Sequence, residues 1–323
     1  MRRRALALLA IALALEPFAA SAQRHSGSAR VGWLSYLGEP DPGLALLHEG
    51  LRELGYVEGK SYVIVARFAD SDFSRLPRLV EELAADRIDV LVSRGPSVDY
   101  AKAVRSSTPV VFAYSGDPVA AGFGDSLQKP GHNMTGITFM AMELSAKRVE
   151  VLKELVPKAT RIALLSNPEH AGELSEYRVT EEAARRLGAT TTRYLVRAPQ
   201  ELATAFDAIR AGKADAMIVF PDSLTLARRK EIAEFAAQAR IPTMYGWTEF
   251  ADAGGLASYG PALAENFKRL SIFVDKILKG ADAGTLPIEQ VRKIGFTFNQ
   301  AAAKALGLAV PPAVLLRADK VIE

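Results

Sequence analysis

Short apolar runs alternate with amphipathic stretches along nearly the whole chain. The apolar runs are rich in valine, isoleucine and leucine, which is typical of strands buried on both faces. The stretches between them repeat apolar positions every three or four residues, which predicts helices. Strands that alternate with helices form βαβ units, so the pattern predicts an α/β fold with parallel sheets covered by helices.

The alternation runs through the chain twice and predicts two similar α/β halves. No long linker or low-complexity tract separates the halves, and the pattern restarts after Asn133–Met140. In the first half we expect strands at Val31–Leu34, Tyr62–Phe68, Val90–Ser93 and Val110–Tyr114, and helices at Leu44–Leu54, Ser74–Asp86 and Val98–Val104. In the second half we expect strands at Ile162–Ser166, Thr191–Val196, Ala216–Phe220 and Thr243–Tyr245, and helices at Ser145–Val156, Leu174–Leu187, Gln200–Arg210 and Leu224–Ala239.

The carboxyl ends of the predicted strands carry small, polar or aromatic residues. In parallel sheets of this kind the ligand crevice lies at those ends. Each residue alone is more simply a helix cap or a turn former, and only their recurrence at one kind of position favours a binding site. The residues are Ser35, Tyr36, Ser93–Ser97, Tyr114–Asp117, Asn167, Asp222 and Tyr245.

Five aromatic residues follow or end β runs instead of forming helical stripes. Rigid aromatic walls combined with a few polar groups suit a small organic ligand. The alternative for each is packing in the core or at the rim of a cleft. These residues are Tyr36, Tyr114, Tyr245, Trp247 and Tyr259.

The N-terminal 22 residues have the pattern of a secretory signal peptide. Arg2–Arg4 precede the apolar run Ala5–Leu15, and Ala20-Ser21-Ala22 provides an Ala-x-Ala cleavage site. A membrane anchor is disfavoured, because an apolar run of this length spans only about 16 Å as a helix, roughly half of the bilayer core. We therefore expect a periplasmic protein, cleaved after Ala22 and without direct membrane insertion.

Composition and charge exclude several classes of protein. The chain has 323 residues, with 40 Lys and Arg, 37 Asp and Glu, 4 His and no Cys. Without cysteine there is no disulfide, thiol nucleophile, thiolate metal site or lipid-anchored N-terminus. Cleavage after Ala22 would leave 37 basic and 36 acidic residues, so no basic stripe supports nucleic-acid binding.

Motifs for catalysis and cofactor binding are missing from the sequence. No Gly-x-Gly-x-x-Gly follows a strand, and neither a phosphate-binding loop nor a Gly-x-Ser-x-Gly elbow occurs. His48-Glu49 begins like a zinc-protease helix, but Arg52 stands where the second histidine is needed. We expect no catalytic residue, no cofactor and no metal site.

Several short segments follow one another in an order that is specific, although each alone is modest. They are Gly32-Trp33-Leu34-Ser35, Gly50–Lys60, Gly116-Asp117-Pro118-Val119, Pro130–Gly136, Leu144–Arg148, Asn167-Pro168, Tyr245-Gly246, Ala253–Leu256, Ser258-Tyr259-Gly260-Pro261, Val274–Gly280, Lys304–Leu308 and Leu315–Asp319. Over essentially all of residues 30–323 the chain resembles the ABC-transporter substrate-binding protein family whose known members take up aromatic and other amino acids.

The resemblance implies a type I periplasmic-binding-protein fold, in which two doubly wound parallel-sheet lobes are joined by three crossovers. We expect the crossovers near Gly136–Phe139, Ala257–Gly260 and Gly295–Phe298. The expected N-terminal lobe is 30–137 plus 260–294, and the C-terminal lobe is 138–259 plus 295–323.

The resemblance also implies the periplasmic solute-binding component of an ABC importer. A monomer would capture a small organic ligand, either an amino acid or an aromatic or aliphatic carboxylate, by hinge closure between its lobes. It would then dock transiently on a permease in the inner membrane. Two alternatives stay open: a periplasmic ligand sensor that feeds a receptor, and an exported α/β enzyme.

The expected ligand contacts follow from the same resemblance and from residue chemistry. Ser35, Asp117, Asn167 and Tyr245 match family positions that face the cleft. The helix after Gly95, with Ser97, would hold a carboxylate, and Asp117 or Asp222 would pair with an amine. The apolar body would lie among Tyr36, Tyr114, Tyr245 and Tyr259, and Gly116 and Thr138 complete the candidate set.

Arg94 is the sharpest departure from the family pattern. The loop expected as Gly-Gly-Pro reads Arg94-Gly95-Pro96, and the segment before Gly116-Asp117 reads Tyr114-Ser115. A guanidinium at a strand end that faces the cleft offers a fork of donors to a carboxylate. An extra cation would favour an acidic ligand over a zwitterionic amino acid. The alternative is that Arg94 points to solvent at the cleft rim and binds nothing.

Overall fold

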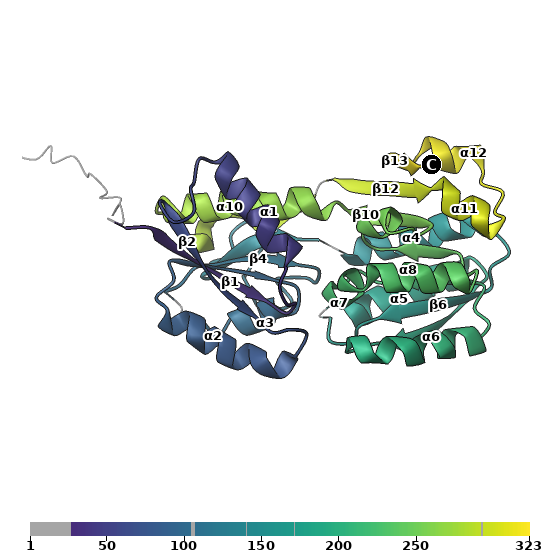
Figure 1. The fold of residues 1–323 in the computed structure, drawn as a ribbon, viewed down its shortest axis with the longest axis horizontal. Helices are drawn as coiled ribbons and strands as arrows, with labels where there is room; N and C mark the ends of the chain where they lie inside the picture. Colours follow the sequence, from purple (N-terminus) through teal and green to yellow (C-terminus); the bar gives the residue numbers. More distant parts are fainter. Residues whose placement is uncertain (1–26, 105–106, 140, 171, 292) are drawn as a thin grey trace, which may run out of the picture.

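The computed structural model describes residues 27–323 apart from 105–106, 140, 171 and 292. The predicted signal peptide, 1–22, lies outside the described residues. Two sheets form two lobes that stand side by side (Figure 1). We call them the first lobe, built on a six-stranded sheet, and the second lobe, built on a seven-stranded sheet.

The first lobe has helices on both faces of its sheet. Its strand order is β11-β5-β4-β3-β1-β2. Helices α1 and α10 lie side by side on one face, and α2 and α3 cover the other (Figure 1). The strands are β1 (Ala29–Ser35), β2 (Tyr62–Phe68), β3 (Val90–Arg94), β4 (Val110–Tyr114), β5 (Met134–Thr138) and β11 (Glu289–Gln290). The helices are α1 (Pro42–Glu53), η1 (Phe73–Arg75), α2 (Leu76–Ala85), α3 (Ser97–Ala101), α10 (Leu263–Leu278) and η3 (Ala283–Thr285).

The second lobe repeats this plan, with the strand order β13-β12-β10-β9-β8-β6-β7. Its pairs are parallel except that β10 and β12 run antiparallel, which departs from the expected all-parallel sheet. The strands are β6 (Arg161–Ser166), β7 (Thr190–Leu195), β8 (Ala216–Val219), β9 (Thr243–Tyr245), β10 (Ala257–Pro261), β12 (Ile294–Asn299) and β13 (Lys320–Ile322). The helices are α4 (Ala141–Leu155), α5 (Glu173–Arg186), η2 (Pro199–Glu201), α6 (Leu202–Ala211), α7 (Ser223–Ala227), α8 (Arg229–Gln238), α9 (Glu249–Asp252), α11 (Gln300–Leu306) and α12 (Pro312–Leu316).

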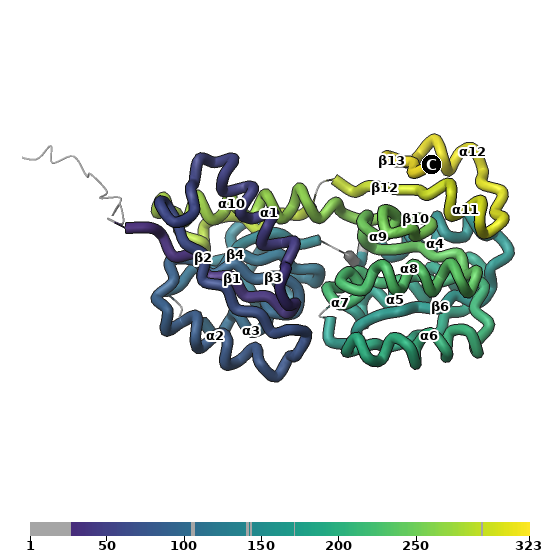
Figure 2. The backbone as a smooth tube through the Cα atoms, in the orientation of Figure 1, coloured from purple at the N-terminus to yellow at the C-terminus, as the bar shows by residue number. Residues whose placement is uncertain are grey.

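The chain passes between the lobes three times, as Figure 2 allows the reader to follow. The passages lie between β5 and α4, between β10 and α10, and between β11 and β12. The expected lobe boundaries, 137/138, 259/260 and 294/295, each fall inside one of the strands β5, β10 and β12. Those exact boundaries remain a prediction, because sheet membership alone does not define a rigid unit.

One predicted helix is divided in two. The expected helix Leu224–Ala239 is interrupted at Arg228, whose φ of −101° and ψ of 17° leave the helical region and separate α7 from α8. This break sets α7 apart as a short helix at the edge of the second lobe that faces the first lobe (Figure 1). The separate helix α7 contributes residues to the candidate site described below.

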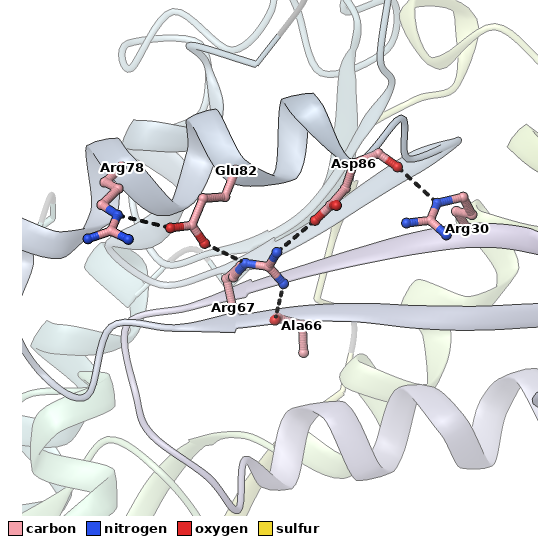
Figure 3. A network of polar contacts seen from close by, with 6 residues as sticks. All are labelled: Arg30, Ala66, Arg67, Arg78, Glu82 and Asp86. Atoms are coloured by element: carbon pink, nitrogen blue, oxygen red, sulfur yellow. Dashed lines mark hydrogen bonds and ion pairs between the residues drawn. The ribbon is translucent and has the colours of Figure 1, made fainter.

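A polar network ties α2 to the edge of the first sheet (Figure 3). Arg67 on β2 donates to Glu82 at 2.8 Å and to Asp86 at 2.7 Å, and it also bonds the carbonyl of Ala66. Arg30 on β1 donates to the carbonyl of Asp86. One guanidinium thus joins two carboxylates of the helix, which fixes the helix against the edge strand β2.

Candidate ligand-binding site

The carboxyl ends of strands from both sheets surround a small cavity between the lobes. This inner cavity measures about 20 Å³. The first lobe contributes the end of β3, and the second lobe contributes the residues that follow β6, β8 and β9. The lining residues are Arg94, Gly95, Ala113, Ser115, Phe139, His170, Asp222, Ser223, Trp247, Leu263 and Phe267.

A larger groove adjoins the inner cavity. This outer groove measures about 580 Å³, which is within the range of small-molecule sites. It shares Arg94, Leu263 and Phe267 with the inner cavity. Its other walls are the loop after β1, with Leu37 to Gly43, and the segment from Leu224 to Arg229. Both lobes therefore line both spaces.

Arg94 stands at the junction of the two spaces. Its side chain is 7% exposed, and its Nη1 lies 2.7 Å from Asp41 Oδ1. The guanidinium also stacks over the Phe267 ring, 4.7 Å from the centroid. The alternative that Arg94 points to solvent is therefore wrong, and so is the expectation of an uncompensated cation, because Asp41 neutralises its charge.

Asp41 is held by its own helix. Its Oδ1 accepts the N–H of Gly43 at 2.8 Å and so caps α1, whose first residue is Pro42. Its Oδ2 is buried and has no hydrogen-bond partner among the described residues. Sequence reasoning missed Asp41, although an Asp-Pro pair directly after the first strand is a helix-start signal at the expected edge of the sheet.

Asp222 lines the inner cavity and has a buried carboxylate. It caps α7, because its Oδ1 accepts the N–H of Leu224 at 2.7 Å, and Asn167 donates to the same oxygen at 3.3 Å. The residue is 2% exposed, and its Oδ2 is buried without a hydrogen-bond partner in the part of the chain that the structure describes. A buried polar atom without a hydrogen bond is costly, so this second oxygen is suited to a ligand cation.

Aromatic rings from three different elements enclose the apolar side of the inner cavity. Phe139, directly after β5, packs edge-on against Trp247 at 5.3 Å and against Phe267 of α10 at 6.4 Å. These residues join the apolar cores of the two lobes into one cluster. Trp247 was noted as an aromatic residue after a strand, whereas Phe139 and Phe267 were missed.

Two of the predicted site residues contact the opposite lobe. Tyr36 Oη lies 2.9 Å from the Ser71 carbonyl and 3.5 Å from the Arg197 carbonyl of the second lobe. Burial raises the pKa of Tyr36 to about 12, so the hydroxyl stays a donor. A Cβ on Gly95 would lie 2.7 Å from Ser223 Oγ, which shows how closely the lobes approach there.

Three other tyrosines are not brought together around one space. Tyr114 packs against Phe123 at 4.7 Å in the core of the first lobe. Tyr245 is fully buried and stacks on Phe250, and Tyr259 packs near Phe296. The predicted tyrosine sandwich is therefore wrong, because strand alternation turns these rings into the cores of the lobes.

The remaining candidates do not line the inner cavity. Gly116, Asp117 and Thr138 line a separate pocket of about 140 Å³, in which Thr138 donates to the Gly116 carbonyl. Asp117 is exposed and its Oδ1 caps a turn by accepting the N–H groups of residues 119 and 120. Ser35 Oγ accepts the N–H of residue 37, and Ser97 Oγ is buried with no hydrogen-bond partner among the described residues.

A buried ionic network lies behind the inner cavity. Arg148 on α4 donates through Nε to the Tyr259 carbonyl at 2.9 Å, and its Nη1 lies 3.5 Å from Glu176 Oε2. Both side chains are 1% exposed. Burial raises the pKa of Glu176 to about 6 and lowers the pKa of Arg148. Among the charges that act on Glu176 is His170, a lining residue of the inner cavity.

Residues 27–323, with the gaps given above, contain no cluster of three or more His, Cys, Asp or Glu side chains arranged to hold a metal ion. In the same part of the chain, no helix combines the length and the apolarity needed to cross a membrane.

The chain is similar in sequence and in structure to several known proteins. The chain is 22% identical over 262 residues to the tyrosine-binding protein of Clostridioides difficile strain R20291, covering 80% of this chain and 75% of that protein. A conserved domain protein from Vibrio cholerae superposes with a TM-score of 0.84 at 25% identity, over 91% of this chain and 99% of that one. An ABC domain from Streptococcus pneumonia in complex with L-Trp superposes with a TM-score of 0.82 at 24% identity, over 91% of this chain and all of that one.

The predicted fold class is confirmed by these superpositions and by the sheet topology. A solute-binding protein from Agrobacterium vitis with bound allitol also superposes, with a TM-score of 0.63 at 16% identity over 86% of this chain and 98% of that one. The family model described as ABC transporter substrate binding protein matches residues 44–322. The chain belongs to the ABC transporter substrate-binding protein family.

Proposed function

We propose that this chain captures an α-amino acid with an aromatic or apolar side chain between its two lobes, outside the cytoplasm, and delivers it to the permease of an ABC importer. The observation that carries the proposal is the unpartnered Oδ2 of Asp222, which is buried beside the inner cavity. It is suited to an ammonium group, because a buried carboxylate gains most from a charged hydrogen-bond donor.

The charges around the inner cavity favour a zwitterion over a simple acid. Arg94 and Asp41 cancel one another, so Asp222 leaves the lining with an excess of negative charge. The guanidinium of Arg94 makes one hydrogen bond, through Nη1 to Asp41, and its other N–H groups, which bond no residue that the structure describes, could meet a carboxylate. The ligand ammonium would lie at Asp222 and its carboxylate at Arg94.

The apolar lining of the outer groove suits the rest of such a ligand. Phe267, which lines both spaces, offers a ring that contacts an aromatic or aliphatic side chain favourably. The C. difficile relative is named a tyrosine-binding protein, and the S. pneumonia structure is a complex with L-Trp. Both names support an amino-acid ligand for this chain.

Capture would work by closure of the two lobes around the three connecting segments. A ligand that touches Asp222 and Arg94 at once bridges the lobes, so it favours the closed arrangement by its differential affinity. Export through the N-terminal segment 1–22 would place the protein in the periplasm, where it would act as a monomer. Recognition of the closed form by the permease would complete delivery.

Calorimetric titration with L-tyrosine and L-tryptophan tests the proposal. We expect Asp222→Asn to weaken binding about ten- to a hundredfold, since hydrogen bonds between charged groups contribute about 1.5–3 kcal/mol. Asp117→Asn is the matched control, because Asp117 is exposed and caps a turn. Equal affinities of wild type and Asp222→Asn would overturn the assignment, and loss of binding in Asp117→Asn alone would move the amine to Asp117.

The two rival functions have separate tests. Recovery of the ligand unchanged after long incubation is expected of a binding protein, and repeated conversion would indicate an enzyme. A ligand sensor would bind the same solute but would act on a receptor. Uptake of labelled L-tyrosine by cells that lack the gene distinguishes these roles, because only a transport component restores uptake when it is returned.

A further inference from the structure

The inner cavity and the outer groove differ greatly in size. The inner cavity of about 20 Å³ holds little more than one water-sized group. The adjoining outer groove of about 580 Å³ has room for a drug-sized molecule. Arg94 and Phe267 line both spaces. A ligand whose ammonium reaches Asp222 in this arrangement must therefore extend past Arg94 into the outer groove.

Helix α7 runs from one space to the other. Asp222 and Ser223 at its start line the inner cavity, and Leu224 and Leu226 line the outer groove. Arg228, which follows the helix, also lines the outer groove. At a rise of about 1.5 Å per residue, α7 is about 7.5 Å long, and Asp222 and Arg228 flank its two ends.

Arg228 brings an unpaired positive charge, as far as the described residues show, to the wall of the outer groove. Its side chain is exposed and makes no hydrogen bond or ion pair with any residue that the structure describes. The neighbouring Arg229 donates to the Leu226 carbonyl at 3.1 Å. Of the acidic groove residues, Glu249 accepts the N–H of Leu263 at 3.3 Å, and Glu39 is exposed.

Asp222 and Arg228 carry opposite charges at the two ends of α7, and this arrangement sets the length of a ligand that could pair with both. A free α-amino acid carries its ammonium and its carboxylate within one residue, or about 3.5 Å of extended chain. Two or three extended residues span about 7–10 Å, which is comparable to the length of α7, the helix that Asp222 and Arg228 flank. The leucine side chains between these ends suit apolar side chains of the ligand.

We propose that the outer groove extends the ligand site to short apolar peptides, with the N-terminal ammonium at Asp222, the first carbonyl at Arg94 and the C-terminal carboxylate at Arg228. This inference rests on the proposed amino-acid function and names a longer ligand for the same site. Arg228 is then a specificity-determining residue that separates a peptide from a free amino acid.

Calorimetric titrations of the full mature protein with L-tyrosine, the dipeptide Tyr-Leu and the C-terminal amide of that dipeptide test the inference. We expect wild type to bind Tyr-Leu at least about tenfold more tightly than L-tyrosine. We expect Arg228→Gln and the amide each to weaken dipeptide binding about tenfold, while the affinity of Arg228→Gln for L-tyrosine stays unchanged. Lys230→Gln is the matched control, because Lys230 is an exposed cation on α8 that does not line the groove.

The outcomes separate the two proposals. Tight binding of L-tyrosine with no gain for Tyr-Leu would overturn the peptide assignment and leave amino-acid capture standing. A dipeptide affinity that is the same in wild type and in Arg228→Gln would also overturn it. Loss of binding of both probes in Asp222→Asn, together with a selective loss for the dipeptide in Arg228→Gln, would support both proposals.

Discussion

Arg94 and Asp41, which are 53 positions apart in the chain, form a buried ion pair in which Arg94 Nη1 lies 2.7 Å from Asp41 Oδ1. The same oxygen of Asp41 caps α1 through the N–H of Gly43. One carboxylate thus joins the end of β3 to the start of α1. The pair also removes the net charge that an arginine alone would bring to the cleft.

Because Arg94 and Asp41 form a buried ion pair, we expect the effects of their substitutions on the free energy of unfolding to be strongly coupled. Asp41→Asn keeps a capping oxygen but leaves Arg94 as a buried cation without its partner, so we expect a loss of about 3–5 kcal/mol in the free energy of unfolding. The double variant Asp41→Asn/Arg94→Met removes the unpaired charge and should recover much of that loss. Urea unfolding of the single and double variants measures the coupling, and additive effects would contradict it.

The buried carboxylate of Glu176 predicts a pH dependence of stability. Burial raises its pKa from 4.5 to about 6, against the attraction of Arg148 and His170, and Glu173 adds to the rise. The folded state therefore binds more protons than the unfolded state between these pH values. The free energy of unfolding should fall as pH rises through this window, by about 2 kcal/mol in total.

Comparison with Glu176→Gln isolates this effect, because glutamine does not titrate. We expect wild type to lose stability relative to the variant between pH 4.5 and pH 6, and the difference to stay constant above about pH 7. Urea unfolding midpoints at closely spaced pH values give the two profiles. Parallel profiles would show that Glu176 titrates at its ordinary pKa in the folded protein.

Strand β10, which leads into α10, and its partner β12 carry two glycines that should differ sharply in how much stability is lost when each is replaced by alanine. Gly260 and Gly295 lie directly opposite each other in the β10–β12 pair. A Cβ on Gly260 would lie 1.8 Å from the Gly246 carbonyl oxygen, whereas a Cβ on Gly295 would meet nothing closer than 3.5 Å. We expect Gly260→Ala to cost about 1–3 kcal/mol of stability and Gly295→Ala to cost much less, as measured by thermal unfolding. Equal effects would mean that the backbone at Gly260 yields freely.

The N-terminal segment predicts a defined mature end. The basic residues Arg2–Arg4, the apolar run and Ala20-Ser21-Ala22 predict cleavage after Ala22. Intact mass measurement of protein released from the periplasm should therefore give a chain that begins at Gln23. Recovery of the full-length chain from the cytoplasm as the sole species would contradict export.

The positions of several strands could be predicted from the sequence because they are short apolar runs that alternate with helices. The predicted bounds of Tyr62–Phe68, Val110–Tyr114 and Thr243–Tyr245 are those of β2, β4 and β9. Apolar content alone marks such runs. The break at Arg228 could not be predicted, since neither proline nor glycine marks it and the apolar periodicity continues into α8.

The edges of the two sheets that carry the site were predictable, but the pairing of side chains there was not. Topology places Arg94 at the carboxyl edge of the first sheet, and Asn167 and Asp222 at the carboxyl edge of the second, which is why these residues were selected. The partner of Arg94 comes from a distant loop, and no periodicity in the sequence records such a contact. The tyrosines were selected for their position in the chain, whereas the direction of each ring depends on strand alternation.

Helix α10 and strand β11 belong to the first lobe but stand near the end of the chain, and α10 lies against α1. On the ribosome, residues 29–138 emerge long before these elements and lack α10, one of the two helices that cover one face of their sheet. The first lobe is therefore completed only when about nine-tenths of the polypeptide has been synthesised. Discontinuity of this kind delays stable folding, and it would keep a nascent precursor in the unfolded form that a secretion channel can thread.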